Sequence, residues 1–172
     1  MSVAQNVEVS TDIASDEDAH QYLTFIMAEE EYGLDILRVQ EIRGWSSVTK
    51  IPNMPSYVKG VINIRGTIVP IIDLRERFSM DNVDYNQTTV VIVVKVISAE
   101  RERVMGIVVD AVSDVYSVQH QAIKEAPDFG GTISIDFVRG LAPVDEKMLI
   151  LLEIDRLLCA DDLDVIQEQE AE

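Results

Sequence analysis

The chain has 172 residues, of which 47% are hydrophobic, so it can bury a substantial core and full disorder is excluded. Its 14 basic and 31 acidic residues give a formal net charge of −17, which argues against nucleic acid or an anionic membrane as the main partner. One cysteine cannot form an internal disulfide, and one cysteine with two histidines falls short of a structural zinc site.

Acidic segments lie at both ends of the chain. Residues 1–20 contain five acidic residues and residues 161–172 contain six, whereas all 14 basic residues lie between Arg38 and Arg156. We therefore predict a disordered acidic tail over residues 1–20, a folded domain over 21–160 and an acidic C-terminal tail over 161–172. Each tail is compatible with a solubilising role or with an interaction arm. No apolar run approaches the ~20 residues that span a bilayer, so we expect a cytoplasmic protein without membrane insertion.

Most of the middle of the chain reads as strands. Residues 22–28 form an aromatic and aliphatic run that three glutamates follow, and residues 88–97 form a β-branched run typical of a buried strand. A charged turn at 98–102 and a second apolar run at 104–112 predict a hairpin. Helical signals are few: residues 154–158 are the best candidate, and residues 73–78 are compatible with a single turn.

The strand-rich part also repeats itself. The positions that follow Gly33 match those that follow Gly106, and the positions that follow Gly60 match those that follow Gly140. Two matching blocks in the same order indicate a duplicated unit of short strands, which suits a small closed barrel. We therefore predict an all-β fold with a first barrel over about 21–85 and a second over 86–160, with exchange of ends between the barrels left open, and a short C-terminal helix.

No catalytic, metal or cofactor site is predicted. His20 reads as a solvated tail residue, His120 as part of a loop or helix start, and Cys159 as a small packing residue. The glycines at 130 and 131 lack the Lys-Ser/Thr ending of a phosphate-binding loop, and the acidic cluster from Asp161 lacks the glycine of a calcium loop. Asp73 and Glu153 end apolar runs at equivalent repeat positions, so we expect both to cap the turn that follows.

Several blocks resemble one family in its own order. They are residues 31–36 (EYGLDI), 39–44 (VQEIRG), 51–55, 58–66 (VKGVINIRG), 69–75 (VPIIDLR) and 106–115. Over about residues 20–160 the chain resembles the CheW family of chemotaxis coupling proteins. The resemblance implies two packed, five-stranded barrels of the SH3-like type. It also implies a non-enzymatic adaptor that joins transmembrane chemoreceptors to the histidine kinase CheA, on the cytoplasmic face of the membrane. An adaptor of the same fold in another chemosensory pathway, such as surface motility, stays open.

The resemblance also implies two binding surfaces. The cytoplasmic tip of the receptor is expected to contact a set of apolar and charged residues: Val39, Glu41, Arg65 and Val90. The regulatory domain of CheA is expected to contact a second set, Thr49, Lys59 and Gly60, and barrel-to-barrel contacts of this kind can build rings or arrays. Three alternatives stay open from the residues alone: Val39 as a core residue, Arg65 as a holder of loop carbonyls, and Gly60 as a simple turn glycine.

Overall fold

The computed structural model describes residues 19–80, 83–98, 101–127 and 135–158. Cys159, the glycine pair at 130–131, the cluster from Asp161 and residues 1–18 and 159–172 lie outside the described residues. Ala19 and His20 were expected in the acidic tail, but they begin the first strand, where His20 stacks edge-on against the ring of His120. In the described part of the chain, no helix is long and apolar enough to cross a membrane.

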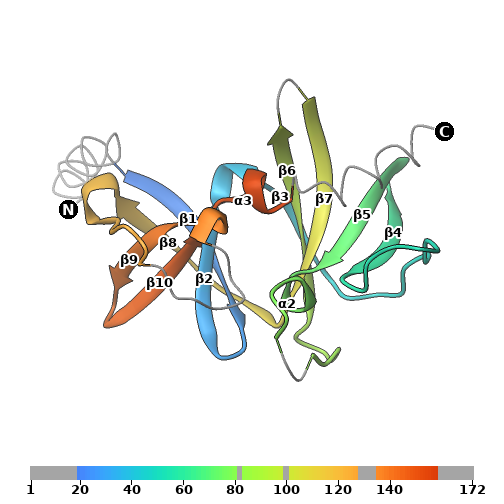
Figure 1. The fold of residues 1–172 in the computed structure, drawn as a ribbon, viewed down its shortest axis with the longest axis horizontal. Coiled ribbons are helices and arrows are strands. Elements are labelled where there is room, and N and C mark those ends of the chain that lie inside the picture. Colours follow the sequence, from blue (N-terminus) through green and yellow to red (C-terminus); the bar gives the residue numbers. More distant parts are fainter. Residues whose placement is uncertain (1–18, 81–82, 99–100, 128–134, 159–172) are drawn as a thin grey trace, which may run out of the picture.

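In the part of the chain that the structure describes, ten strands form two five-stranded sheets, and the helices are short (Figure 1). The first sheet, here called the β1 barrel, has the order β8-β1-β2-β10-β9. Its strands are β1 (Ala19–Met27), β2 (Glu30–Asp35), β8 (Ala111–Gln119), β9 (Val138–Val144) and β10 (Lys147–Leu152). The second sheet, the β6 barrel, has the order β3-β6-β7-β5-β4. Its strands are β3 (Val39–Gly44), β4 (Val58–Ile64), β5 (Thr67–Asp73), β6 (Val90–Ser98) and β7 (Arg101–Val109). The predicted all-β fold with two five-stranded units is confirmed.

The two sheets exchange strands between the halves of the chain. Each sheet takes one hairpin, β1–β2 or β6–β7, from one half and its three other strands from the other half. In each sheet the two halves meet in one parallel pair, β2 with β10 or β5 with β7, and in one antiparallel pair, β1 with β8 or β3 with β6. The sheets therefore do not divide at residue 85. After each of the hairpins β1–β2 and β6–β7 the chain passes to the other sheet, which is the exchange of ends that the sequence left open.

Equivalent glycines perform equivalent tasks in the two barrels. A Cβ on Gly33 would lie 2.9 Å from the side chain of Leu151, and one on Gly106 would lie 2.6 Å from that of Ile71. In both cases the missing side chain lets a parallel strand pack closely. This correspondence gives the sequence repeat a physical basis, since both copies need the same space.

In each sheet, one isolated β-bridge brings the chain beyond an edge strand back to the opposite edge, so that the sheet closes partly into a barrel. The chain beyond β3 returns to β4 through paired backbone hydrogen bonds between Thr49 and Val61 (3.0 and 2.8 Å). The chain beyond β8 returns to β9 in the same way between Lys124 and Leu141 (2.7 and 2.8 Å). Closure pairs the backbone of strands that would otherwise be exposed edges.

Apolar side chains form three clusters. One lies inside the β6 barrel and includes Val69, Val91 and Val93, and one lies inside the β1 barrel around Tyr22 and Leu151. The largest lies between the barrels and takes side chains from β1, β2, β5, β6, β7 and β10, so it is called the shared core. In Figure 1 the two barrels accordingly lie side by side. Alternate residues of the central strands thus face either a barrel interior or the shared core.

The short helices lie where the sequence indicated them. Helix α2 (Leu74–Arg77) follows β5 and helix α3 (Ile154–Leu157) follows β10, and 3-10 turns occupy Ile36–Arg38 (η1), His120–Ala122 (η2) and Ile135–Phe137 (η3). Asp73 caps α2 as predicted, because its carboxylate accepts the Arg75 N–H at 3.0 Å. The cap prediction for Glu153 is wrong, since its side chain makes no cap hydrogen bond. Aspartate, with the shorter side chain, is the better N-cap residue.

Candidate interaction surface

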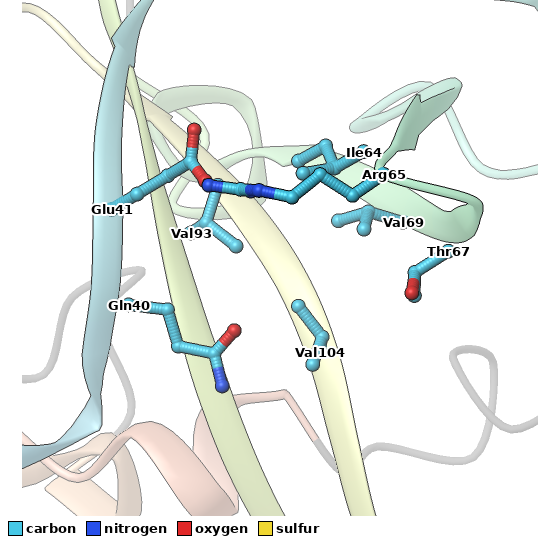
Figure 2. A pocket seen from close by; sticks show the side chains of 8 residues that line it. All are labelled: Gln40, Glu41, Ile64, Arg65, Thr67, Val69, Val93 and Val104. Carbon is cyan, nitrogen blue, oxygen red and sulfur yellow. The ribbon is translucent and has the colours of Figure 1, made fainter.

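An ion pair crosses the mouth of the β6 barrel. Arg65 lies in the β4–β5 turn and donates from Nη1 and Nη2 to Glu41 Oε1 on β3, at 2.9 and 3.0 Å. Figure 2 shows the arginine reaching across a pocket of about 470 Å³ toward the glutamate. Glu41 Oε2 also lies 3.5 Å from Arg43 Nη1. The Arg65 side chain is 76% exposed, so its guanidinium stays accessible to a partner although it is already paired.

The pocket below this ion pair has apolar walls and a polar rim. Val69, Val93 and Ile64 of its lining belong to the interior cluster of the β6 barrel, and Gln40 and Thr67 stand with the ion pair at the rim. The pocket therefore opens into one barrel and does not lie between the two. Arg65 itself has a positive φ of 49° in the hairpin turn, and Asn63 Oδ1, not the arginine, accepts the Gly66 N–H. These contacts favour the pairing role of Arg65 over that of a holder of loop carbonyls.

Val39 and Val90 both pack against the shared core and are half-buried. They lie at opposite ends of the β3–β6 ladder, because Val39 pairs with Val94 and Val90 pairs with Gly44. Val90 and Val94 are four positions apart on β6, which corresponds to about 13 Å. A helix of about nine residues would span both side chains. Val39 therefore packs against the core and keeps part of its side chain accessible, and its contact with a receptor stays a prediction.

A register shift places Val39 and Glu41 on opposite faces of β3. The shift lies between these two residues, so Val39 pairs with Val94 of the shared core while Glu41 pairs with Val93 of the barrel interior. In a regular strand, residues two apart share a face. The four residues expected at the receptor contact thus divide into an apolar pair beside the shared core and an ion pair over the barrel mouth.

Thr49 and Gly60 lie against each other. A Cβ on Gly60 would lie only 2.1 Å from the carbonyl oxygen of Thr49, and the φ of Gly60 is +145°, a conformation that other residues rarely adopt. The group that leaves no room for a side chain at Gly60 is therefore the backbone of Thr49, where the segment after β3 pairs with β4. Gly60 is accordingly more than a simple turn glycine. Thr49 is exposed beside it.

Lys59 already has a partner within the protein. Its Nζ forms an ion pair with Glu76 Oε2 of α2, and about a quarter of each side chain is exposed. The pair ties β4 to the helix that follows β5. The structure therefore places Thr49 against Gly60, whereas the side chain of Lys59 is engaged with α2 and its charge is balanced.

Two exposed apolar residues near β3 were not singled out from the sequence. Ile42 is 44% exposed and pairs with Ile92 of the shared core, so it continues the apolar face of Val39 toward the edge of the sheet. Leu37 of η1 is 76% exposed. Residues 39–44 were recognised from the sequence as a repeat and family motif, which does not say which apolar side chain lies at a sheet edge. An exposed apolar side chain marks a contact surface only where it continues a larger apolar patch, as Ile42 continues that of Val39.

A buried charged network lies on the other side of the β6 barrel. Arg75 is 3% exposed and pairs with Asp73 at 2.9 Å and with Asp110 at 2.8 Å. Burial works to lower the pKa of Arg75, but hydrogen bonds and the charges of Asp73 and Asp110 outweigh burial and raise it. Burial and the neighbouring Asp73 raise the pKa of the Tyr85 hydroxyl, which donates to the same carboxylate. Arg75 is paired with both carboxylates and Tyr85 donates to one of them, which is typical of a structural role. Among the described residues, no group of three or more His, Cys, Asp or Glu side chains could hold a metal ion.

Comparisons with known proteins place this architecture. Residues 21–161 match the CheW-like domain. The chain belongs to the CheW-like domain family. It is 46% identical over 154 residues to the chemotaxis protein CheW of Klebsiella aerogenes, with 90% of each chain covered. It is 37% identical to the probable chemotaxis protein CheW of Rhizobium etli, over 80% of this chain and 86% of that one.

The structure agrees with a solved member of the family. The scaffolding protein TtCheW of Thermoanaerobacter tengcongensis superposes with a TM-score of 0.73 at 35% identity, covering 83% of this chain and 90% of that one. The predicted family is therefore confirmed, and with it the prediction of a non-enzymatic scaffold protein.

Proposed function

We propose that this chain couples the cytoplasmic tips of transmembrane chemoreceptors to the regulatory domain of the histidine kinase CheA. The observation that carries the proposal is the similarity, over nine tenths of the chain, to a chemotaxis protein CheW. The shared fold with a CheW scaffolding protein supports it independently. The protein acts at the inner face of the membrane, within receptor arrays, and contributes no chemical step.

The receptor surface is formed along β3. Val39 and Val90, extended by Ile42, offer a half-buried apolar stripe against which an amphipathic receptor helix docks. Arg65 adds specificity, because its exposed guanidinium retains free N–H donors beyond those that Glu41 accepts. A carboxylate of the receptor that reaches the rim of the barrel mouth competes with Glu41 for this arginine.

The kinase surface is formed where the segment that contains Thr49 pairs with β4. Thr49 offers an exposed polar side chain there, and Gly60 leaves room for the backbone of Thr49. Lys59 holds α2 against β4 through its ion pair with Glu76. Contacts between like barrels, made head to tail, extend into rings. A receptor change that alters the relative affinity of two arrangements of such an assembly biases the kinase without any chemistry in the adaptor.

The test is co-precipitation of the purified protein with a receptor fragment and, separately, with the regulatory domain of CheA, at two salt concentrations. Arg65→Glu is expected to weaken receptor binding about tenfold at low salt and less at high salt, because salt screens exposed charges. Arg101→Glu is the matched control: Arg101 is an exposed arginine on β7 of the same barrel, and the change in net charge is identical. Full receptor-dependent kinase activation by Arg65→Glu would show that this residue is not part of the receptor surface. Absence of binding by the unaltered protein to either partner would refute the proposed function.

A further inference from the structure

The chain crosses between the two barrels at two described places, and both crossings carry a charged residue. The first crossing is η1, between β2 of the β1 barrel and β3 of the β6 barrel, and it ends at Arg38. The second is Asp110, which separates β7 of the β6 barrel from β8 of the β1 barrel. Each crossing is a short single segment of backbone. Its contacts with the two barrels therefore decide how rigidly the barrels are held relative to each other.

At the first crossing, Arg38 is held by Asp155 of α3. Two hydrogen bonds form a bidentate pair, Nη1 to Oδ1 at 2.7 Å and Nη2 to Oδ2 at 2.9 Å. Asp155 Oδ1 also accepts the backbone N–H of Ile97 at 2.8 Å, and Arg38 Nη1 donates to the carbonyl of Lys95 at 3.3 Å. Because α3 follows β10 while Lys95 and Ile97 belong to β6, this ion pair joins the crossing to both barrels.

At the second crossing, Asp110 is held by Arg75 of α2. Arg75 Nη1 donates to Asp110 Oδ1 at 2.8 Å, and Asp110 Oδ2 accepts the N–H of Ala28 at 2.9 Å. The backbone N–H of Asp110 donates to the carbonyl of Ile26 at 3.0 Å. Ala28 lies in the β1–β2 turn, whereas α2 follows β5, so this ion pair too joins both barrels to the crossing.

The two ion pairs occupy equivalent places with opposite polarity. Arg75 and Asp155 are each the second residue of the short helix that follows the last strand of their repeat. In one half the helix supplies the cation and the crossing supplies the anion, and in the other half the roles are reversed. The shared core supplies attraction between the barrels, but apolar burial is non-directional. Charge-assisted hydrogen bonds are directional, and the Arg38–Asp155 pair has two of them while the Arg75–Asp110 pair has one.

We propose that Arg38–Asp155 and Arg75–Asp110 are two clamps that set the angle between the β1 barrel and the β6 barrel. The four side chains are positioning residues. Each clamp ties a short helix and a crossing to the opposite barrel, so the angle is held at two places instead of one. The opposite polarity also prevents either helix from pairing with the other crossing. Such an exchange would place Arg75 beside Arg38 and Asp155 beside Asp110, which are like charges.

The experiment measures the distance between spin labels on the two barrels by pulsed electron resonance. The labels are attached to Arg101→Cys on β7 and Gln119→Cys on β8, both exposed positions, in a background that carries Cys159→Ala. Asp110→Asn and Asp155→Asn each remove one charge with little change in volume. We expect the double variant to broaden or shift the distance distribution and each single variant to do so less.

Glu31→Gln is the matched control, because its ion pair with Lys147 is equally short (2.8 Å) but joins two strands of the same barrel. It is expected to leave the distribution unchanged, and Asp155→Glu, which retains the carboxylate, is expected to restore most of the narrow distribution. An unchanged distribution in the folded double variant overturns the proposal. If circular dichroism shows that the double variant does not fold, Asp155→Asn alone decides, and no broadening relative to Glu31→Gln overturns it.

A second measurement rests on the proposed function. The double variant is expected to bind the receptor fragment and the kinase domain separately as the unaltered protein does, and to lose most receptor-dependent kinase activation, because the two surfaces no longer hold a fixed angle. Full activation by a variant with a broadened distribution would overturn the link from the angle to signalling. Failure of the unaltered protein to bind either partner would refute the proposed function and leave the label distances as the test of the clamps.

Discussion

Replacing Gly60 with alanine puts a methyl group where the structure has room only for the backbone of Thr49. The new Cβ would lie 2.1 Å from the Thr49 carbonyl oxygen and 2.7 Å from its carbonyl carbon. Backbone atoms cannot rotate away as the end of a flexible side chain can. The Thr49–Val61 bridge must therefore open, and with it the closure of the β6 barrel.

The expected cost has two parts. A non-glycine residue at a φ of +145° is strained by about 1–3 kcal/mol. Each of the two bridge hydrogen bonds contributes about 1 kcal/mol. Gly60→Ala should therefore lower the free energy of unfolding by about 3–5 kcal/mol, a large part of the stability of an ordinary domain.

Two other glycines separate the clash from the backbone strain. Gly66 has a φ of +88° but open space around its Cα, so Gly66→Ala should cost only about 1–2 kcal/mol. Gly44 has neither a positive φ nor a close neighbour, so Gly44→Ala should be neutral or stabilise by up to about 1 kcal/mol.

Urea unfolding measures all three variants. Far-UV circular dichroism follows the whole fold, and fluorescence of Trp45, the single tryptophan, follows the segment that leads to Thr49. A cost for Gly60→Ala no greater than that for Gly66→Ala would refute the reasoning, because the clash would then contribute nothing. Kinase binding by Gly60 variants has meaning only for the folded fraction, since the same change opens the proposed surface.

Arg75→Ala removes the buried cation and leaves the carboxylates of Asp73 and Asp110 without it. The free energy of unfolding, measured in urea, should therefore fall by about 3–5 kcal/mol. A loss below about 1 kcal/mol would contradict a structural role for the network. Burial raises the pKa of Glu31, but the hydrogen bonds from Lys147, Thr24 and Ser113 and the charge of Lys147 together outweigh burial, so the net pKa lies below the ordinary 4.5. Its stabilisation is therefore present above pH 4.5 and is lost as the pH falls through the lower folded value. The stability difference between the unaltered protein and Glu31→Gln should accordingly be largest near neutral pH and shrink toward pH 3 in urea titrations; a difference that grows on acidification would contradict the pairing.

Features set by local spacing were readable in the sequence. The aromatic, aliphatic and β-branched runs predicted strands, and the matched glycines predicted two like units, because each copy needs the same empty space beside a parallel strand. The cap at Asp73 was readable for the same reason, since it depends on the two residues that follow. The strand predicted over 22–28 is present but runs from Ala19 to Met27. Ala28 and Glu29 form a two-residue turn with positive φ, and Glu30 and Glu31, which were read as the stop, begin β2.

The candidate surfaces were readable only as a set of residues. The motif named Val39 and Glu41 together, yet the register shift between them sends one toward the shared core and the other over the barrel mouth. A shift of this kind depends on the partner strand, and β6 lies about fifty residues further along the chain. Gly60 was identified as a position that tolerates no side chain, but the group that fills its space, Thr49, is known only once the chain has folded back.

The amino-acid order by itself determined the class of the protein: short strands in two like sets, no membrane-spanning run, acidic ends, and the motifs of a scaffold family. Folding alone decided which hairpin enters which sheet, where the two crossings run, and that the ion pairs beside them have opposite polarity. Strand periodicity and turn residues act over a few neighbours, so they are visible in sequence. Exchange between halves and the pairing of Arg38 with Asp155 depend on energies summed over contacts distant in the chain, which no local pattern contains.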